Sequence, residues 1–165
     1  MHGLLKTIVI GAMALAAMPA LAQTATKRAQ HNAWGTYTYP SQGGAVCYVL
    51  SVPTDKQPTG LDHGDIYFFV SRKAGGGLEP QFIAGYNLQQ DSKVTVSVGD
   101  KSFTMFTRGK SAWVENPADE PALVAAMKAG SDMKVAAKSG RGNATGYSFS
   151  LKGISAALDS IKVCN

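Results

Sequence analysis

Residues 93–114 read KVTVSVGDKSFTMFTRGKSAWV, and this stretch decides the fold class. Its first part alternates valine with threonine or serine, which is the two-residue period of a strand with one buried face. The dipeptides Gly99-Asp100 and Gly109-Lys110 separate three such runs, and dipeptides of this kind form tight turns between antiparallel strands. The stretch therefore predicts a three-stranded antiparallel meander.

Similar segments, rich in aromatic and β-branched residues, lie on both sides of the meander. Two other stretches have the apolar spacing of short helices: residues 120–129, which Asp119 is expected to cap and Gly130 to end, and residues 154–161. The sequence thus predicts an antiparallel all-β domain with one or two short helices. The predicted strands are 34–39, 45–52, 65–72, 81–86, 93–98, 102–107, 112–115, 133–138 and 145–151.

The N-terminus reads as a cleavable secretory signal peptide over residues 1–22. Lys6 precedes the mostly apolar run 7–18, and Ala20-Leu21-Ala22 forms a small-x-small cleavage site. The run is shorter than the ~20 residues that span a bilayer, so a transmembrane anchor is not expected after cleavage. Residues 23–33 then read as a flexible lead-in, and residues 34–165 as one β domain. The domain is expected in the periplasm or the medium.

The formal charge of the whole chain is +5, and removal of Lys6 with the signal leaves +4. This mild excess is compatible with ordinary solubility, or with attraction to anionic lipopolysaccharide, phospholipid or nucleic acid. Because the sequence contains no run of five like charges, no nucleic-acid partner is predicted.

The chain has two cysteines, Cys47 and Cys164, and both belong to the exported part. Paired thiols persist as disulfides outside the cytoplasm, so the sequence predicts a Cys47–Cys164 bridge, worth about 4–5 kcal/mol in the chain-entropy model. A metal or redox pair is the alternative. The spacing is far from C-x-x-C and neither cysteine has a histidine nearby, which favours the structural bridge.

The sequence lacks the G-x-S-x-G, Walker, dinucleotide-binding and H-E-x-x-H motifs. Its nearest polar constellation is Asp62-His63-Gly64-Asp65, which can be imagined as a metal site or a general base. It is also typical of a turn in which Asp62 and Asp65 bond backbone groups and Gly64 has a positive φ. We favour the turn and expect no catalytic, cofactor-binding or metal residues. For a solvated His63, replacement by alanine is expected to change stability by no more than about 0.5 kcal/mol.

Several aromatic residues fall in the first predicted strands. They suggest either a ligand-stacking face or, more often in small β domains, core residues and cross-strand pairs. They are Tyr37, Tyr39, Tyr48, Tyr67, Phe68 and Phe69.

Taken in order, many segments resemble the invasion-associated locus B family of exported alphaproteobacterial proteins. The resemblance covers nearly the whole mature chain, and Gly85-Tyr86-Asn87 departs from the expected Gly-Tyr-Pro. It implies a β-sandwich of immunoglobulin-like character, periplasmic or secreted, in a family named for host-cell invasion, and it carries over no catalytic residue. The matching segments are Cys47–Pro53, Asp55–Pro58, Ile66–Arg72, Val94–Val96, Asp100–Phe106, Ala112–Asn116, Leu123–Lys128, Ser148–Gly153 and Ser155–Leu158.

Three functions remain compatible with the sequence. The first is a non-enzymatic module that binds an unidentified protein or envelope surface component, and an exposed apolar patch would favour it. The second is a structural or stress-protective envelope protein without a specific ligand. The third is a hydrolase that uses the Asp62, His63 and Asp65 loop, and it would require a pocket around His63 with a perturbed pKa.

Overall fold

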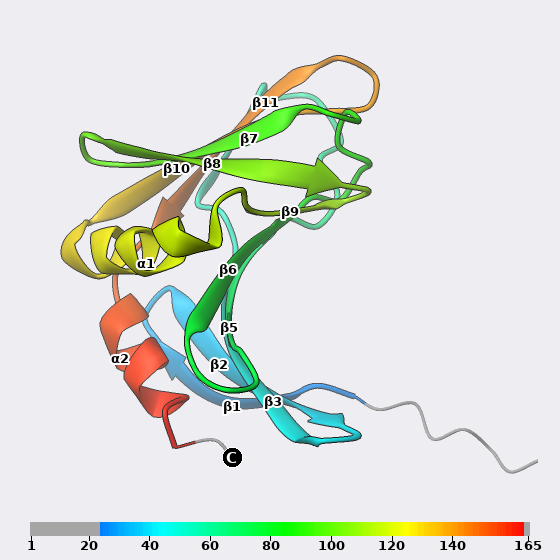
Figure 1. Ribbon diagram of the computed structural model, residues 1–165. Coiled ribbons are helices and arrows are strands. Elements are labelled where there is room, and N and C mark those ends of the chain that lie inside the picture. The colour runs from blue at the N-terminus through cyan, green and yellow to red at the C-terminus, as the bar shows by residue number, and fades with distance from the viewer. Residues whose placement is uncertain (1–23, 164–165) are drawn as a thin grey trace, which may run out of the picture.

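The computed structural model describes residues 24–163 (Figure 1). The signal peptide expected at 1–22 and Cys164 lie outside these residues. The described chain forms eleven strands, a short 3-10 turn η1 (Pro117–Asp119) and the helices α1 (Glu120–Ala129) and α2 (Ile154–Ser160). The strands are β1 (Thr26–His31), β2 (Trp34–Ser41), β3 (Gly44–Ser51), β4 (Asp55–Gln57), β5 (Tyr67–Arg72), β6 (Leu78–Ile83), β7 (Lys93–Val98), β8 (Lys101–Arg108), β9 (Ser111–Val114), β10 (Asp132–Lys138) and β11 (Ala144–Ser150).

All these strands pair in one antiparallel sheet with the order β1-β2-β3-β5-β6-β9-β8-β7-β10-β11-β4. The sheet bends along β5 and β6, so that β1, β2 and β3 lie in one layer and β7, β8 and β10 in the other (Figure 1). The bend brings distant strands together, because the Trp34 indole Nε1 in β2 donates to the Ser150 carbonyl in β11 (3.0 Å). The predicted all-β, sandwich-like fold with two short helices is confirmed.

The core fills the inside of this bend, where both helices lie (Figure 1). Alternate strand residues point inward, and the Phe68 ring of β5 meets the Phe149 ring of β11 with centroids 5.9 Å apart. Leu123 of α1 and Ile154 of α2 are buried in the same core cluster. Each side chain of this size contributes about 1.5–3 kcal/mol when buried, so both helices help to hold the two layers together.

The nine predicted strands are all present, with 81–86 shifted to 78–83, and residues 93–114 form the predicted meander β7-β8-β9. The expectation of a flexible lead-in at 23–33 is wrong, because residues 26–31 form β1, which pairs with β2. β1 is an edge strand with mostly exposed side chains, so it lacks the apolar alternation that reveals a strand in a sequence. β4 was missed for the same reason.

The helix predicted at 120–129 is α1, but Asp119 does not cap it. Asp119 already has helical backbone angles and makes no side-chain cap bond, because η1 precedes α1 directly. The capping side chain is Asn116, which accepts from the Ala118 amide (3.2 Å) at the start of η1. Gly130 ends α1 as expected, and its amide bonds the Ala126 carbonyl.

Candidate functional site

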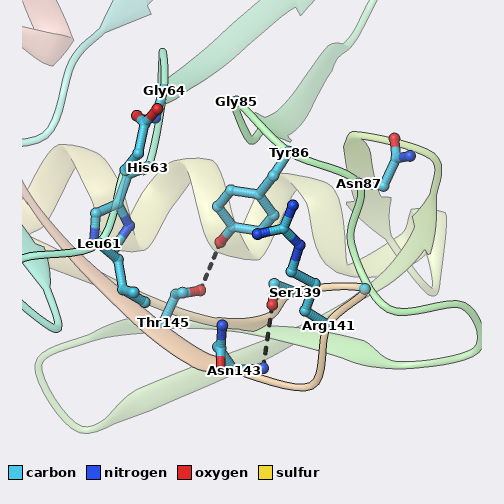
Figure 2. Close-up of a pocket in the computed structure, with 12 residues that line it drawn as sticks. Leu61, His63, Gly64, Gly85, Tyr86, Asn87, Ser139, Arg141, Asn143 and Thr145 are labelled. Atoms are coloured by element: carbon cyan, nitrogen blue, oxygen red, sulfur yellow. Dashed lines mark hydrogen bonds between the residues drawn. The ribbon is translucent and has the colours of Figure 1, made fainter.

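Three loops enclose a cavity of about 620 Å³ (Figure 2). They are the residues 61–64 before β5, the residues 85–87 after β6, and the turn 139–143 between β10 and β11. Figure 2 shows Leu61 and His63 on one side of the cavity and Asn87 and Arg141 on the other. Thus the Asp62-His63 loop singled out in the sequence does border a cavity.

The 61–64 loop is the turn that the sequence predicted. The Gly64 amide donates to Asp62 Oδ1 (2.9 Å), and Gly64 has φ +59°. A Cβ placed on Gly85 would lie 2.4 Å from the His63 carbonyl oxygen, so the two loops pack backbone against backbone. Asp65 does not bond the backbone as expected: within the described residues it makes no hydrogen bond or ion pair.

His63 corrects the expectation of a solvated imidazole. Only 6 % of the residue is exposed, and both ring nitrogens are bonded. Nε2 lies 2.9 Å from the Pro58 carbonyl, which can only accept, so Nε2 carries the hydrogen. In the neutral ring, Nδ1 then accepts from the Tyr147 hydroxyl at 2.9 Å.

The bonds continue from His63 along a chain of hydroxyl groups. The Tyr147 hydroxyl lies 2.7 Å from that of Tyr86, which lies 2.6 Å from the Thr145 hydroxyl (Figure 2). The Ala137 carbonyl, 3.3 Å from the Thr145 hydroxyl, is the alternative acceptor for the single hydrogen of that hydroxyl. Burial, supported by the hydrogen bond to Tyr86, raises the pKa of Tyr147 far above its ordinary value. These contacts hold the side chains of the network in position.

The network limits what His63 can do chemically. Each ring nitrogen already has a protein partner, so the imidazole has no free position for a substrate proton in this arrangement. Within residues 24–163, no group of three or more His, Cys, Asp or Glu side chains is placed to hold a metal ion. The buried network therefore supports the cavity wall.

A second feature lies on the face of the bent sheet opposite the core. Residues that alternate with the core positions of β2, β3, β5, β8 and β9 carry large apolar side chains there, in half-buried or exposed positions. We call this surface the outer aromatic face. It consists of Tyr37, Tyr48, Leu50, Tyr67, Phe69, Phe106 and Trp113.

The strand register aligns the outer aromatic face across the sheet, with polar Gln81 of β6 between Phe69 and Trp113. Leu50 pairs with Phe69, Phe69 with Gln81, and Gln81 with Trp113. Trp113 in turn pairs with Phe106, and their rings stack with centroids 5.7 Å apart. Phe106 is 40 % exposed. The sequence-based assignment of the aromatics to cross-strand pairs holds for Tyr37 and Tyr48, whereas of the six residues only Phe68 is core.

Comparison with known proteins agrees with this architecture. A family model described as "Invasion associated locus B (IalB) protein" matches residues 34–162. The chain belongs to the IalB family. No curated protein matches the chain. A crystal structure of invasion associated protein b from Bartonella henselae matches this IalB-family chain with a TM-score of 0.60, 17 % identity, and coverage of 81 % of this chain and 94 % of that one. At this identity the match shows the fold alone.

The remaining candidate residues of this IalB-family protein are its cysteines. Cys47 is buried in β3, and Cys164 lies outside the described residues, so the disulfide stays a prediction. None of the described helices is long and apolar enough to cross a membrane. Sequence reasoning missed Tyr86, Thr145 and Tyr147, because no motif links these residues to His63.

Proposed function

We propose that this IalB-family chain is an exported, non-enzymatic protein of the periplasm or the medium that docks a protein or an envelope surface component on its outer aromatic face. The observation that carries the proposal is the alignment of these aromatic residues on β3, β5, β9 and β8, with Gln81 of β6 between the two halves and Phe106 the most exposed member. Soluble proteins that work alone rarely expose large contiguous apolar patches, whereas interaction surfaces do.

The composition of the face supports a protein-like partner. Tyrosine, tryptophan and phenylalanine are enriched at the centres of protein interfaces, because each combines a large rigid area with little entropy to lose. Charge near the face is balanced, since Lys93 pairs with Glu115 and Lys73 with Glu120. These aromatic side chains favour the binding module over a structural envelope protein that has no partner.

The non-enzymatic part of the proposal rests on the His63 network. The hydrolase alternative needs a free imidazole in the cavity, and both nitrogens of this imidazole are engaged. A link to host interaction has one support, the likeness to proteins named for invasion. Repeating the binding experiment below with host-cell extract tests that link separately.

Export itself depends on residues 1–22. We expect the protein recovered from the periplasm or the medium to begin at Gln23, because Ala20 and Ala22 follow the apolar run. Intact mass measures the start of the chain. A product that retains residues 1–22, or one that begins well inside Trp34, would contradict this boundary.

The docking face is tested by capture from envelope extracts of the producing bacterium, with bound species quantified by mass spectrometry. Phe106→Ser and Tyr67→Ser are expected to recover about tenfold less of a discrete partner, since truncation of an interface aromatic commonly costs 1–2 kcal/mol or more. Ala122→Ser is the control, because Ala122 is exposed on α1, which lies inside the bend of the sheet. Unchanged recovery by both face variants, with folding confirmed by circular dichroism, would show that this face is not the docking surface.

A further inference from the structure

We propose that the cavity between the three loops binds a small anionic saccharide, whose acidic group is paired by Arg141 and whose hydroxyl groups are held by the amides and the carboxylate along its walls. This inference does not depend on docking at the outer aromatic face. It rests on which polar groups of the cavity are already satisfied and which are left over.

Arg141 is the cationic side chain that lines the cavity. It stands in the β10–β11 turn, is exposed, and extends in the direction of Tyr86 in Figure 2. Within residues 24–163 its guanidinium has no carboxylate or carbonyl partner. A guanidinium offers five donors in a planar fork that matches a carboxylate or a phosphate, so an acidic group is the natural ligand for it.

Two further cations surround the same cavity. Lys56 Nζ donates to the Gly64 carbonyl (2.9 Å), and Lys110 Nζ lies 3.5 Å from the Gly85 carbonyl. Both carbonyls belong to residues that line the cavity. Among the lining residues Arg141 and Asp62 balance in formal charge, so the local excess that favours an anion comes from Lys56 and Lys110 beside the lining.

The same lining explains why the ligand should also carry hydroxyl groups. Asn87 and Asn143 line the cavity, and their side-chain amides make no hydrogen bond within the described part of the chain. Each amide can both donate and accept, as a hydroxyl requires. One oxygen of Asp62 accepts from Gly64, which leaves the other to accept from a ligand hydroxyl.

The positions of these groups determine the orientation of the bound saccharide in the cavity. Arg141 and Asn87 lie opposite the loop that carries Asp62, as Figure 2 shows through Leu61 and His63 of that loop. The acidic end of the saccharide therefore lies at the Arg141 side and its neutral hydroxyls at the Asp62 side. The volume of about 620 Å³ is within the usual size of small-molecule sites.

The test is titration of the isotope-labelled mature protein with four probes, followed by NMR. The probes are glucuronate, glucose 6-phosphate, neutral glucose, and acetate as an anion without hydroxyls. Glucuronate, glucose 6-phosphate or both are expected to shift the amide signals of Gly64, Gly85 and Asn143 and to bind at least about tenfold more tightly than glucose or acetate, because only they offer the acidic group and the hydroxyls together. The ratio of the two acids tells whether the acidic group is a carboxylate or a phosphate.

Variants assign the binding to Arg141. Arg141→Ala is expected to weaken binding of the acidic sugar about tenfold or more, and Arg141→Lys to weaken it less, because lysine keeps the charge but loses the planar fork. Lys134→Ala, on the exposed side of β10, removes the same charge outside the cavity and should leave binding unchanged. The proposal is wrong if no acidic probe binds by about 10 mM, if glucose binds as tightly, or if Arg141→Ala binds like the parent protein.

Discussion

The burial of His63 depends on residues that lie outside its own tetrapeptide. Its neighbours Asp62, Gly64 and Asp65 are turn formers, yet its ring is buried and bonded at both ends. The partners come from Pro58, on the same loop, and from Tyr147, 84 residues away. A polar ring can be buried at low cost only when such partners satisfy it.

Replacement of His63 by alanine is therefore expected to destabilise the fold by about 2–4 kcal/mol. The change leaves the Pro58 carbonyl without its partner, removes one of the two hydroxyl partners of Tyr147, whose bond to Tyr86 remains, and opens a cavity in the loop packing. Urea unfolding measures the loss. Asp65→Ala is the control, because Asp65 is exposed and should change stability by no more than about 0.5 kcal/mol. A loss of that small size for His63→Ala would mean that the ring is solvated in solution.

Tyr147 predicts how stability responds to alkaline pH. Burial raises its pKa in the folded state, with the hydrogen bond to Tyr86 adding to the shift. A group with a raised folded pKa stabilises the fold fully below its unfolded pKa, near 10 for tyrosine, and loses that contribution as the pH rises toward the folded value. Stability should thus fall above about pH 10.

Tyr147→Phe isolates this effect from the other titrating groups. The variant should be less stable at neutral pH by about 1–2 kcal/mol, because His63 Nδ1 loses its donor, and its stability should fall less steeply above about pH 10. Unfolding in urea from about pH 7 to about pH 11 gives both quantities. Parallel pH curves for the two proteins would contradict the assignment to Tyr147.

At the scale of elements, the junction of β1 with α2 holds the edge of the sheet in place. Gly153 precedes α2 with φ +95°, and a Cβ there would lie 1.9 Å from the His31 carbonyl oxygen. The last residue of β1 thus packs against the start of α2, which explains how a polar edge strand becomes ordered.

A pair of glycine variants separates close packing from backbone strain. Gly142 also has a positive φ, +86°, but a Cβ there meets nothing within 4 Å. Gly142→Ala should cost about 1 kcal/mol from the left-handed backbone alone. Gly153→Ala should cost about 1–3 kcal/mol more, because β1 or α2 must move. Hydrogen exchange of the β1 amides shows whether that strand is released, and equal melting temperatures for the two variants would refute the contact.

At the scale of the whole molecule, the C-terminal segment returns to the strand that carries Cys47. The pairing of Tyr48 with Ser71 places Arg72 opposite Cys47, on the same face of the sheet. The Arg72 guanidinium bonds the carbonyls of Ile161 and Lys162. Lys162 is two residues before Cys164, so the described chain ends within reach of Cys47.

We therefore expect a disulfide between Cys47 and Cys164 in the exported protein. It closes a loop of more than a hundred residues and should add about 4–5 kcal/mol to stability. Alkylation of the denatured, non-reduced protein should add no label, and reduction should then allow two. Cys47→Ser, Cys164→Ser and the double variant should be destabilised equally, because each removes the same single bridge. Two labels without reduction would rule the bridge out.

The sequence by itself determined most of the elements. The alternation of Val94, Val96 and Val98 and the turn glycines 99 and 109 locate a meander, and the spacing of Leu123, Val124 and Met127 locates α1. These signals are local, because in a strand or helix with one buried face the apolar residues recur with the period of that element. Family membership could likewise be inferred from the order of short segments, and it is confirmed.

Only the tertiary structure decided what lies inside, what lies outside and what borders the cavity. The capping role of Asn116, the ordering of β1 and the burial of His63 all depend on neighbours that local period does not encode. In β5 the two-residue period already predicts that Phe68 and Phe69 lie on opposite faces with Phe68 in the core, and the structure adds which elements cover the Phe68 side. The type of a side chain determines how much free energy its burial would gain. The bend of the sheet and the placement of the helices determine which face of each strand is buried.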